Sequence, residues 1–573
     1  MDPRHSENLE LLDITRHYLN FEQLSQWVHE AQRRWPRWVR LSSLGDSHEG
    51  RPLWCLTVTD FETGSDLDRS AVWVDGNLHA SELSGTNACL HLLQELVENQ
   101  TELLAEVAFY LVPRVCPDGA ELALAGDPRF LRSSVRPYPF ADPVGSGIEP
   151  QDVDGNGKLL WMRVPDPRGA WKACAEDARL LVRREVEDRD GEFYRLLPEG
   201  RWRGDYDPHL HQSAPALQAL DLNRNFPHRW RGEHQQAGAG PYPASEPEVR
   251  HCVEFLMNHR NVCQAITFHT FSGVILRPYS TEPDEALPKG DLDNFKYFGE
   301  RGSHWTGYPL LCVYHDFRYS PKDNITGTFD DWVYEALGAY SWTVEIWSVL
   351  RKAGITTGLD RQAKRGEHRF IRWFEEHPIA EEMQLLQFCD DHLEGRGFVN
   401  WQPFQHPDLG PVEIGGWDMF YLFRNPPAKF LQAELEPLTR WVVWLAQANP
   451  RLVLAEQREI SLGNDLYRLE LVVDNAGWLP THGSQKALEG KLVRGVRVEL
   501  SGYSELVEGK RELQLGQLEG ICSRPPSPLW HKGDASDYRV KVSWVVRAGS
   551  RPVVWRVLHD RAGRLEGSFL KQK

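Results

Sequence analysis

The stretch VWVDGNLHASE, residues 72–82, sets the fold and supplies the first half of a candidate metal site. Residues 72–74 have the apolar, branched character of a buried strand, and residues 75–77 predict the turn after it. His79 and Glu82 follow three positions apart at the entrance to a helical stretch, so both side chains can reach one ion. An imidazole nitrogen and a carboxylate oxygen are an ordinary zinc ligand pair. Because this spacing also occurs by chance, the motif needs support from the rest of the chain.

Strand and helix patterns alternate on both sides of this stretch. Asn20, with Gln23 three positions later, predicts the capped start of a first helix. Apolar strand patterns recur farther along the chain, and a helical stretch from 83 to 96 separates the first two; the patterns cover residues 72–74, 107–112, 265–268 and 340–344. This alternation predicts an α/β fold with a mixed, mostly parallel twisted sheet that is flanked by helices.

A chain of 573 residues is too long for a single core. We predict an α/β domain over residues 1–380, which contains an insertion rich in Pro, Gly and charge at about 126–215. A helical connector is expected at 381–454. Residues 455–573 alternate apolar and polar positions with period two between Gly and Pro turns, which predicts a small antiparallel β-sandwich.

The composition narrows the partners and the compartment. The net charge is 65 − 82 = −17 and no dense basic run is present, which disfavours nucleic acid as a partner. No apolar run is long enough to span a bilayer, so no membrane partner is expected. The nine cysteines are scattered without a CxxC pair, as in proteins of a reducing compartment. With no apolar run after the first residues, we predict a cytoplasmic protein.

Three later patterns give the His79 and Glu82 pair its context. His269 ends the strand pattern of residues 265–268, and DLNRNF stands at residues 221–226. Glu345 ends the otherwise apolar strand pattern of residues 340–344. A carboxylate at the end of such a strand must have a partner or a raised pKa, because an unpaired buried charge is costly.

The order of these patterns resembles that of the zinc metallocarboxypeptidases, the carboxypeptidase A-like or funnelin family, over residues 17–380. Four shorter motifs agree with the resemblance: GRPL at 50–53, PDG at 117–119, SEPE at 245–248 and GTFDDW at 327–332. The resemblance implies a carboxypeptidase-like sheet over these residues, and the predicted β-sandwich would then be an accessory module. We expect that module to pack on or restrict the catalytic funnel.

The resemblance also implies the metal centre and its chemistry. His79, Glu82 and His269 would bind one zinc ion per chain and leave a position open for water. Asp221 would accept a hydrogen bond from His79 and fix its tautomer. Glu345 would be the general base that deprotonates the zinc-activated water and passes the proton to the leaving amine.

The resemblance further implies a grip on the substrate. Asn223 and Arg224 would bind the free carboxylate at its C-terminus, for which a planar guanidinium is well suited. Asp330 stands where the family has its specificity residue and would favour a basic side chain; the alternative is that Asp330 caps a helix. The family's capping tyrosine is assigned to Tyr319, with Tyr314 in the same loop.

Two arginines of the family pattern need an assignment in this chain. The arginine that stabilises the oxyanion is assigned to Arg163, with Arg132 and Arg136 as open alternatives. Ala80 and Ser81 stand where digestive members of the family carry an arginine between the histidine and the glutamate. The contact of that arginine with the penultimate substrate residue is therefore expected to be absent.

The resulting hypothesis is a zinc metallocarboxypeptidase that hydrolyses the C-terminal peptide or peptide-like bond of a substrate with a free carboxylate. Two alternatives stay open at this stage: a zinc amidase acting on cell-wall or γ-linked peptides, and an inactive peptide-binding protein on the same fold. The loop DVDGNGK, residues 152–158, begins like a calcium-binding loop but lacks the closing glutamate, so we predict a turn. The sequence makes no prediction of the oligomeric state.

Overall fold

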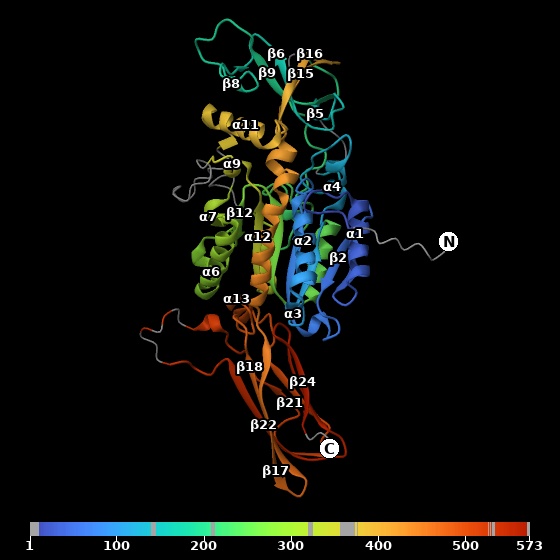
Figure 1. Ribbon diagram of the computed structural model, residues 1–573, viewed down its shortest axis with the longest axis vertical. Helices are drawn as coiled ribbons and strands as arrows, with labels where there is room; N and C mark the ends of the chain where they lie inside the picture. Colours follow the sequence, from blue (N-terminus) through green and yellow to red (C-terminus); the bar gives the residue numbers. More distant parts are fainter. Residues whose placement is uncertain are drawn as a thin grey trace, which may run out of the picture.

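The computed structural model describes residues 11–138, 145–207, 212–318, 325–355, 373–374, 376–524, 527, 529 and 533–569. Its central element is an eight-stranded sheet with strand order β1-β2-β4-β3-β11-β14-β12-β13 (Figure 1). The strands are β1 Val39–Asp46, β2 Pro52–Val58, β3 Ser70–Gly76, β4 Val107–Val112, β11 Val262–Thr270, β12 Val274–Arg277, β13 Leu310–Cys312 and β14 Tyr340–Ile346. The four adjacent strands from β4 to β14 are parallel, and antiparallel pairs lie toward the edges. The predicted mixed, mostly parallel sheet is confirmed.

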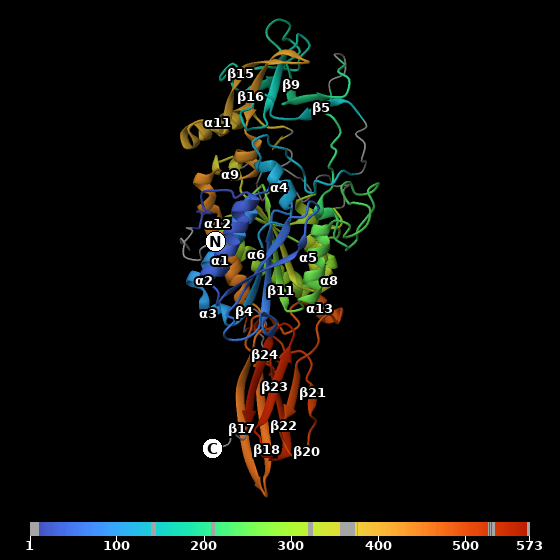
Figure 2. The same cartoon turned by 90° about the vertical axis from the view of Figure 1, so that its right-hand side faces the viewer.

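Helices cover both faces of this sheet (Figure 2). One face packs against α1 Phe21–Arg34, α2 Ser84–Asn99, α6 Lys289–Thr306 and α12 Ala428–Gln447, and the other against α5 Pro247–Asn258 and α8 Phe329–Leu337. Along β3, Val72 and Val74 face the first layer while Trp73 faces the second. This alternation is the period of two that a strand imposes on its side chains. Asn20 and Gln23 form the predicted capping box of α1. Shorter helices are α3 Thr101–Leu104, α4 Pro117–Leu124, α7 Val313–Asp316 and α9 Val349–Lys352.

A second, smaller sheet is shared between the insertion and the segment after the large sheet. Its order is β15-β16-β6-β9-β7-β8, and a separate two-stranded sheet joins β5 and β10. The strands are β5 Gly147–Pro150, β6 Trp161–Pro165, β7 Trp171–Ala173, β8 Leu181–Arg183, β9 Tyr194–Pro198, β10 Gly200–Arg203, β15 Phe398–His406 and β16 Gly410–Trp417.

The prediction of a helical connector over 381–454 is therefore wrong for its middle part. After α11 (Ile379–Leu393), β15 and β16 form strands because β16 pairs with β6 of the insertion, Ile414 opposite Met162. This pairing joins residues about 250 positions apart, so no local pattern could report it. A single π-helical turn, η4 (Met419–Arg424), then leads into α12.

The C-terminal segment forms the predicted antiparallel β-sandwich. Two four-stranded sheets, β17-β18-β22-β20 and β21-β19-β23-β24, enclose an apolar core that includes Trp544 and Trp555. The strands are β17 Leu452–Gly463, β18 Leu466–Asn475, β19 Arg497–Ser501, β20 Glu505–Glu508, β21 Glu512–Gln514, β22 Arg539–Arg547, β23 Val553–His559 and β24 Gly563–Phe569, and α13 Gln485–Glu489 lies at the junction.

The β-sandwich docks on the edge of the large sheet where the parallel strands begin. The buried Arg561 donates to the carbonyl oxygens of Gly338 and His482 at 3.0 and 2.8 Å, and Gly338 lies just before β14. The small six-stranded sheet lies at the opposite end of the molecule (Figures 1 and 2). The expectation that the β-sandwich restricts the funnel is therefore wrong. The carboxyl ends of the parallel strands lie at the other edge of the large sheet, on the side of the small six-stranded sheet.

Within the described residues, no helix combines the length and the apolar character needed to span a membrane.

Candidate metal centre and active site

The candidate site lies at the carboxyl ends of three neighbouring parallel strands. β3 leads into the loop that carries His79 and Glu82, and β11 carries His269 near its end. β14 carries Glu345, which lies directly opposite His269 in the ladder between β11 and β14. Residues 190 positions apart thus meet because parallel strands end at one edge of the sheet.

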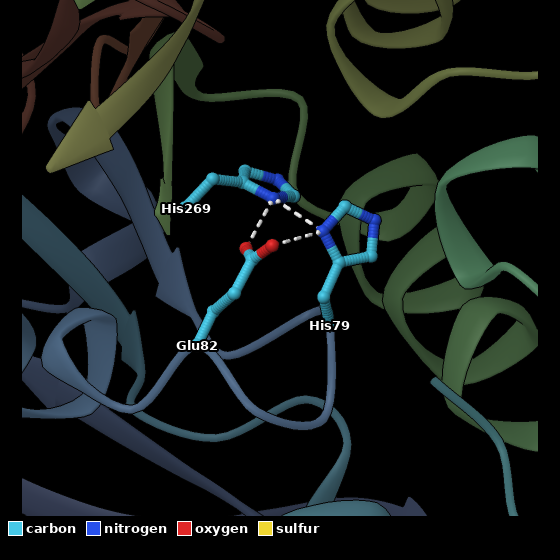
Figure 3. Close-up of side chains that lie close together, drawn as sticks. All are labelled: His79, Glu82 and His269. Atoms are coloured by element: carbon cyan, nitrogen blue, oxygen red, sulfur yellow. Dashed lines mark hydrogen bonds and ion pairs between the residues drawn. The ribbon is translucent and has the colours of Figure 1, made fainter. Parts of the chain in front are cut away.

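Three ligand-type side chains converge on one point (Figure 3). His79 Nδ1 lies 3.0 Å from Glu82 Oε1, and His269 Nδ1 lies 3.0 Å from Glu82 Oε2. The two Nδ1 atoms are themselves 3.0 Å apart. All three side chains are buried, with at most 3% of each residue exposed. The structure thus brings these three sequence-predicted residues together.

The hydrogen bonds of the Nε2 atoms of His79 and His269 determine which ring nitrogen of each histidine faces the metal centre. His79 Nε2 lies 3.2 Å from Asp221 Oδ1, and the guanidinium of Arg132 helps hold the pKa of Asp221 well below its usual range despite burial. His269 Nε2 lies 3.2 Å from the hydroxyl of Thr267, which donates its own proton to Asp75. Each Nε2 atom therefore carries the ring proton, and the two Nδ1 lone pairs point at each other and at the Glu82 carboxylate. These electron-rich atoms repel one another unless a cation lies between them. Two imidazole nitrogens and one carboxylate are a fitting ligand set for zinc.

Positive charge beside Glu82 keeps its carboxylate ionised. Burial raises the pKa of Glu82, but the charge of His79 and His269, when the two rings are protonated in place of a bound cation, outweighs burial and holds the pKa well below its usual range. The backbone N–H of Thr270 donates to Glu82 Oε2 at 3.1 Å. Burial and the neighbouring His79 lower the pKa of His269, which favours the neutral ring that a metal requires.

Glu345 is the fourth functional side chain at this edge. Burial and the nearby Glu82 raise its pKa well above the usual range, while Arg132 and Arg424 act in the opposite direction. Its side chain is partly exposed, unlike those of the three ligand-type residues. A carboxyl with a raised pKa beside a metal centre suits the transfer of protons.

Asn223 and Arg224 lie in a short 3-10 turn, η2 (Leu222–Arg224), that directly follows Asp221. Arg224 Nη1 donates to the carbonyl of Asn223 at 2.7 Å, and Asn223 Oδ1 accepts the backbone N–H of Phe329 at 2.8 Å. The turn is thus fixed to the start of α8, where the buried Asp330 accepts the backbone N–H of Asp331. Asp330 lies in the first turn of α8, while the N-cap position belongs to Thr328.

Arg163 lies away from this site, so its assignment as the oxyanion arginine is wrong. It is part of β6 in the small sheet, where its Nε donates to Glu413 at 2.7 Å and its guanidinium stacks on Tyr194 and Trp401. Arg136, the second alternative, pairs with Glu246.

Arg132, the remaining alternative, lies at the metal centre. Its Nε donates to Asp221 Oδ2 at 2.8 Å, and its Nη1 is 3.7 Å from Glu82 Oε1. The sequence analysis placed the start of the insertion at about residue 126. In the structure, however, Arg132 still packs against the large domain, because its carbonyl accepts the backbone N–H of Ala80 at 3.0 Å. The chain therefore follows the large domain past Arg132 before it leaves for the small sheet.

Sequence reasoning missed the contribution of the segment before α12. Arg424 Nη1 donates to the hydroxyl of Ser81 at 3.1 Å, so an arginine does stand beside the position that was expected to lack one. The two residues are 343 positions apart, and no spacing or motif joins them. Tyr319 lies outside the described residues, and Tyr314 belongs to α7.

The 152–158 loop forms the predicted turn. Asp152 accepts backbone N–H groups from Gly155, Asn156 and Gly157 at 2.7–3.2 Å. The carboxylate of Asp152 thus stabilises the turn by accepting hydrogen bonds from the backbone of the same loop.

Comparison with known proteins places this fold and site in a class. Residues 24–141 and 190–355 match the family model described as zinc carboxypeptidase, and residues 451–569 match a domain of unknown function (DUF8731). Through residues 24–141 and 190–355, the chain belongs to the zinc carboxypeptidase family. The cofactor of that family is a zinc ion, and the His79, Glu82 and His269 cluster is its candidate site here.

Individual relatives are distant. Carboxypeptidase A6 of Mus musculus is 24% identical over 347 residues, which cover 57% of this chain and 60% of the relative. Carboxypeptidase B2 of Bos taurus is 23% identical over 349 residues, covering 57% of this chain and 62% of the relative. The crystal structure of carboxypeptidase A from Helicoverpa armigera has 17% identity and a TM-score of 0.39, over 68% of this chain and 76% of that one. The chain spans about three fifths of the length of these curated relatives.

Proposed function

We propose that this protein is a zinc-dependent metallocarboxypeptidase that removes the C-terminal residue from peptides or peptide-like amides. The observation that carries the proposal is the convergence of the two Nδ1 lone pairs of His79 and His269 on the Glu82 carboxylate, with Glu345 on the neighbouring strand. Membership of the zinc carboxypeptidase family supports the same reading. The peptide substrate, with its free carboxylate, is part of this proposal.

Zinc at this centre would polarise the scissile carbonyl and acidify the attacking water. Glu345 accepts the proton of that water and returns it to the leaving nitrogen. Its high pKa favours the first transfer, because burial and Glu82 both make the protonated carboxyl more stable. Asp221 keeps the proton of His79 on Nε2, so that the Nδ1 lone pair stays available.

Arg132 is assigned the stabilisation of negative charge on the carbonyl oxygen. Its guanidinium is anchored by Asp221 through Nε and reaches toward Glu82 with Nη1. A donor fixed in this way loses little freedom when charge develops, which is the property that an oxyanion site needs.

Arg224 and Asn223 are assigned to the C-terminal carboxylate of the substrate, as the sequence predicts. Their shared turn is tied to α8 through Phe329, next to Asp330. We assign Asp330 to the pocket for the departing side chain, where its carboxylate would favour lysine or arginine. The location in the cytoplasm stays a prediction, supported by nine unpaired cysteines.

The deciding experiment is an assay of the zinc-loaded full-length chain on matched peptides with free and with amidated C-termini. We expect release of the last residue only from the free form, and none from a Glu345→Gln variant that still holds zinc. Cleavage of both forms at equal rates would contradict the carboxypeptidase assignment and favour an amidase. Stoichiometric zinc without cleavage of any peptide would favour a binding protein.

A further inference from the structure

A segment outside the residues matched to the family lies against the loop that carries Glu82. The π-helical turn η4 (Met419–Arg424) ends there, and the next residue, Asn425, has no exposed surface. π-Helical turns are rare and are often found at functional sites. The segment follows the last family-matched residue, 355, by more than sixty positions.

The amide of Asn425 is bonded to both sides of Glu82. Its Oδ1 accepts the backbone N–H groups of Leu83 and Ser84 at 2.8 and 3.3 Å. Its Nδ2 donates to the carbonyl of Ser81 at 2.9 Å. Glu82 therefore lies between two backbone peptides that one side chain holds in place.

These bonds also supply the missing cap of α2. The residue at the N-cap position of α2 is Leu83, whose aliphatic side chain cannot accept a hydrogen bond. The first N–H groups of a helix have no partner within the helix and are normally satisfied by a polar side chain close by in sequence. Here the cap comes from Asn425, 342 positions along the chain from Leu83.

Two hydrogen bonds fix the segment that carries Asn425. Its backbone N–H donates to the carbonyl of Phe420 at 2.9 Å, which closes the π turn whose first residues are capped by Asp418. Trp347, two positions after Glu345, donates its ring N–H to the carbonyl of Leu422 at 2.6 Å. The segment thus links the residues that follow β14, the strand of Glu345, to the loop that carries Glu82.

We propose that Asn425 is a positioning residue of the metal centre. By fixing residues 81–84 it holds Glu82 in the geometry that the metal requires, before the metal arrives. Such preorganisation slows the release of the ion, since the ligand has no alternative orientation to relax into. The inference rests on the proposed function only in taking the cation of this centre to be zinc.

The test compares zinc release from the full-length holoprotein into excess chromogenic chelator. We expect Asn425→Ala to release zinc about 10–100-fold faster than the wild type, because loss of a residue that orients metal ligands weakens metal affinity by about that factor. The matched control is Asn475→Ala in the β-sandwich. Asn475 is also buried, accepts two backbone N–H groups and donates to two carbonyls, yet it lies where the β-sandwich meets the end of α12, away from the metal centre. We expect this control to lower the melting temperature and to leave zinc release unchanged.

Equal release from the two alanine variants would overturn the positioning role. If Asn425→Ala does not fold, Asn425→Asp decides the question, because it keeps the acceptor for Leu83 and Ser84 but cannot donate to Ser81. Release more than threefold faster than from Asn475→Ala supports the role, and a smaller difference contradicts it. A wild-type chain that holds zinc and cleaves no peptide would defeat the proposed function and leave the role of Asn425 standing.

Discussion

Replacement of Arg132 by methionine tests the assignment of the oxyanion arginine. Nε of Arg132 donates to Asp221 at 2.8 Å, which directs the guanidinium, and Nη1 lies 3.7 Å from Glu82. Methionine preserves much of the side-chain length and apolar stem while removing every N–H donor. Loss of one oxyanion donor typically lowers kcat by about 100–1,000-fold, or roughly 2.7–4 kcal/mol of transition-state stabilisation.

The loss should fall on kcat more than on KM, because the developing charge exists only in the transition state. Asp221 keeps two partners in the variant, the ring of His79 and the backbone N–H of Asn223 at 2.8 Å. We therefore expect the zinc content to stay close to one per chain. The assay is steady-state release of the C-terminal residue, with zinc measured on the same samples.

Arg163→Met is the matched control. It removes the pair with Glu413 and the stacking on Tyr194 and Trp401, so stability should fall by about 1–3 kcal/mol. Turnover should be unchanged, because Arg163 lies in the small sheet. If Arg163→Met lost its turnover and Arg132→Met kept kcat within threefold of the wild type, the reasoning from geometry would be refuted.

Four other changes have defined outcomes. Glu345→Gln should bind zinc normally and lose turnover by at least about 100-fold; a variant with near-native kcat would exclude Glu345 as the base. Asp330→Leu should shift the preference from C-terminal lysine toward leucine, and an unchanged ratio of kcat/KM values would remove Asp330 from the pocket. Arg561→Leu removes the donor from the carbonyls of Leu337 and His482, and one of two donors from the carbonyl of Gly338. It should cost at least about 3 kcal/mol in urea denaturation, and a smaller loss would mean that the junction is weak. Burial raises the pKa of Glu248 to about 7. The folded chain therefore binds this proton more tightly, and its stability falls as the pH rises from about 4.5 to about 7. Glu248→Gln should flatten that fall by up to about 3 kcal/mol in pH-dependent melting, and an unchanged slope would rule this carboxyl out.

Residues that stand at strand ends were predictable from the sequence. His269 and Glu345 each close an apolar strand pattern, and parallel strands bring their carboxyl ends to one edge of a sheet. His79 and Glu82 are local to each other, so their convergence needed only the turn after β3. The family resemblance then supplied the roles that residue types alone leave open.

Features that depend on pairing between distant segments could not be predicted. Residues 398–417 were assigned to a helical connector, yet their partner strand is β6, which local periodicity does not reveal. Arg132 and Arg163 both fall in the stretch that the sequence assigns to the insertion, so local patterns could not decide which of them reaches the site. The contacts of Asn425 could not be predicted from the sequence, because an asparagine before two prolines is typical of an ordinary turn.

The position of Asn425 and α12 has a consequence for the order in which this protein is made. α12 packs on α2 in the core that covers one face of the large sheet. Asn425 lies three positions before the first residue of α12. A nascent chain that has emerged through residue 355 contains all the metal ligands but neither the cap of α2 nor this helix. At about 5–20 residues per second, the ribosome needs on the order of 5–20 s more to deliver them. During that interval the Glu82 loop lacks its hydrogen bonds to Asn425, so the proposed role of Asn425 implies that the metal centre is completed late in synthesis.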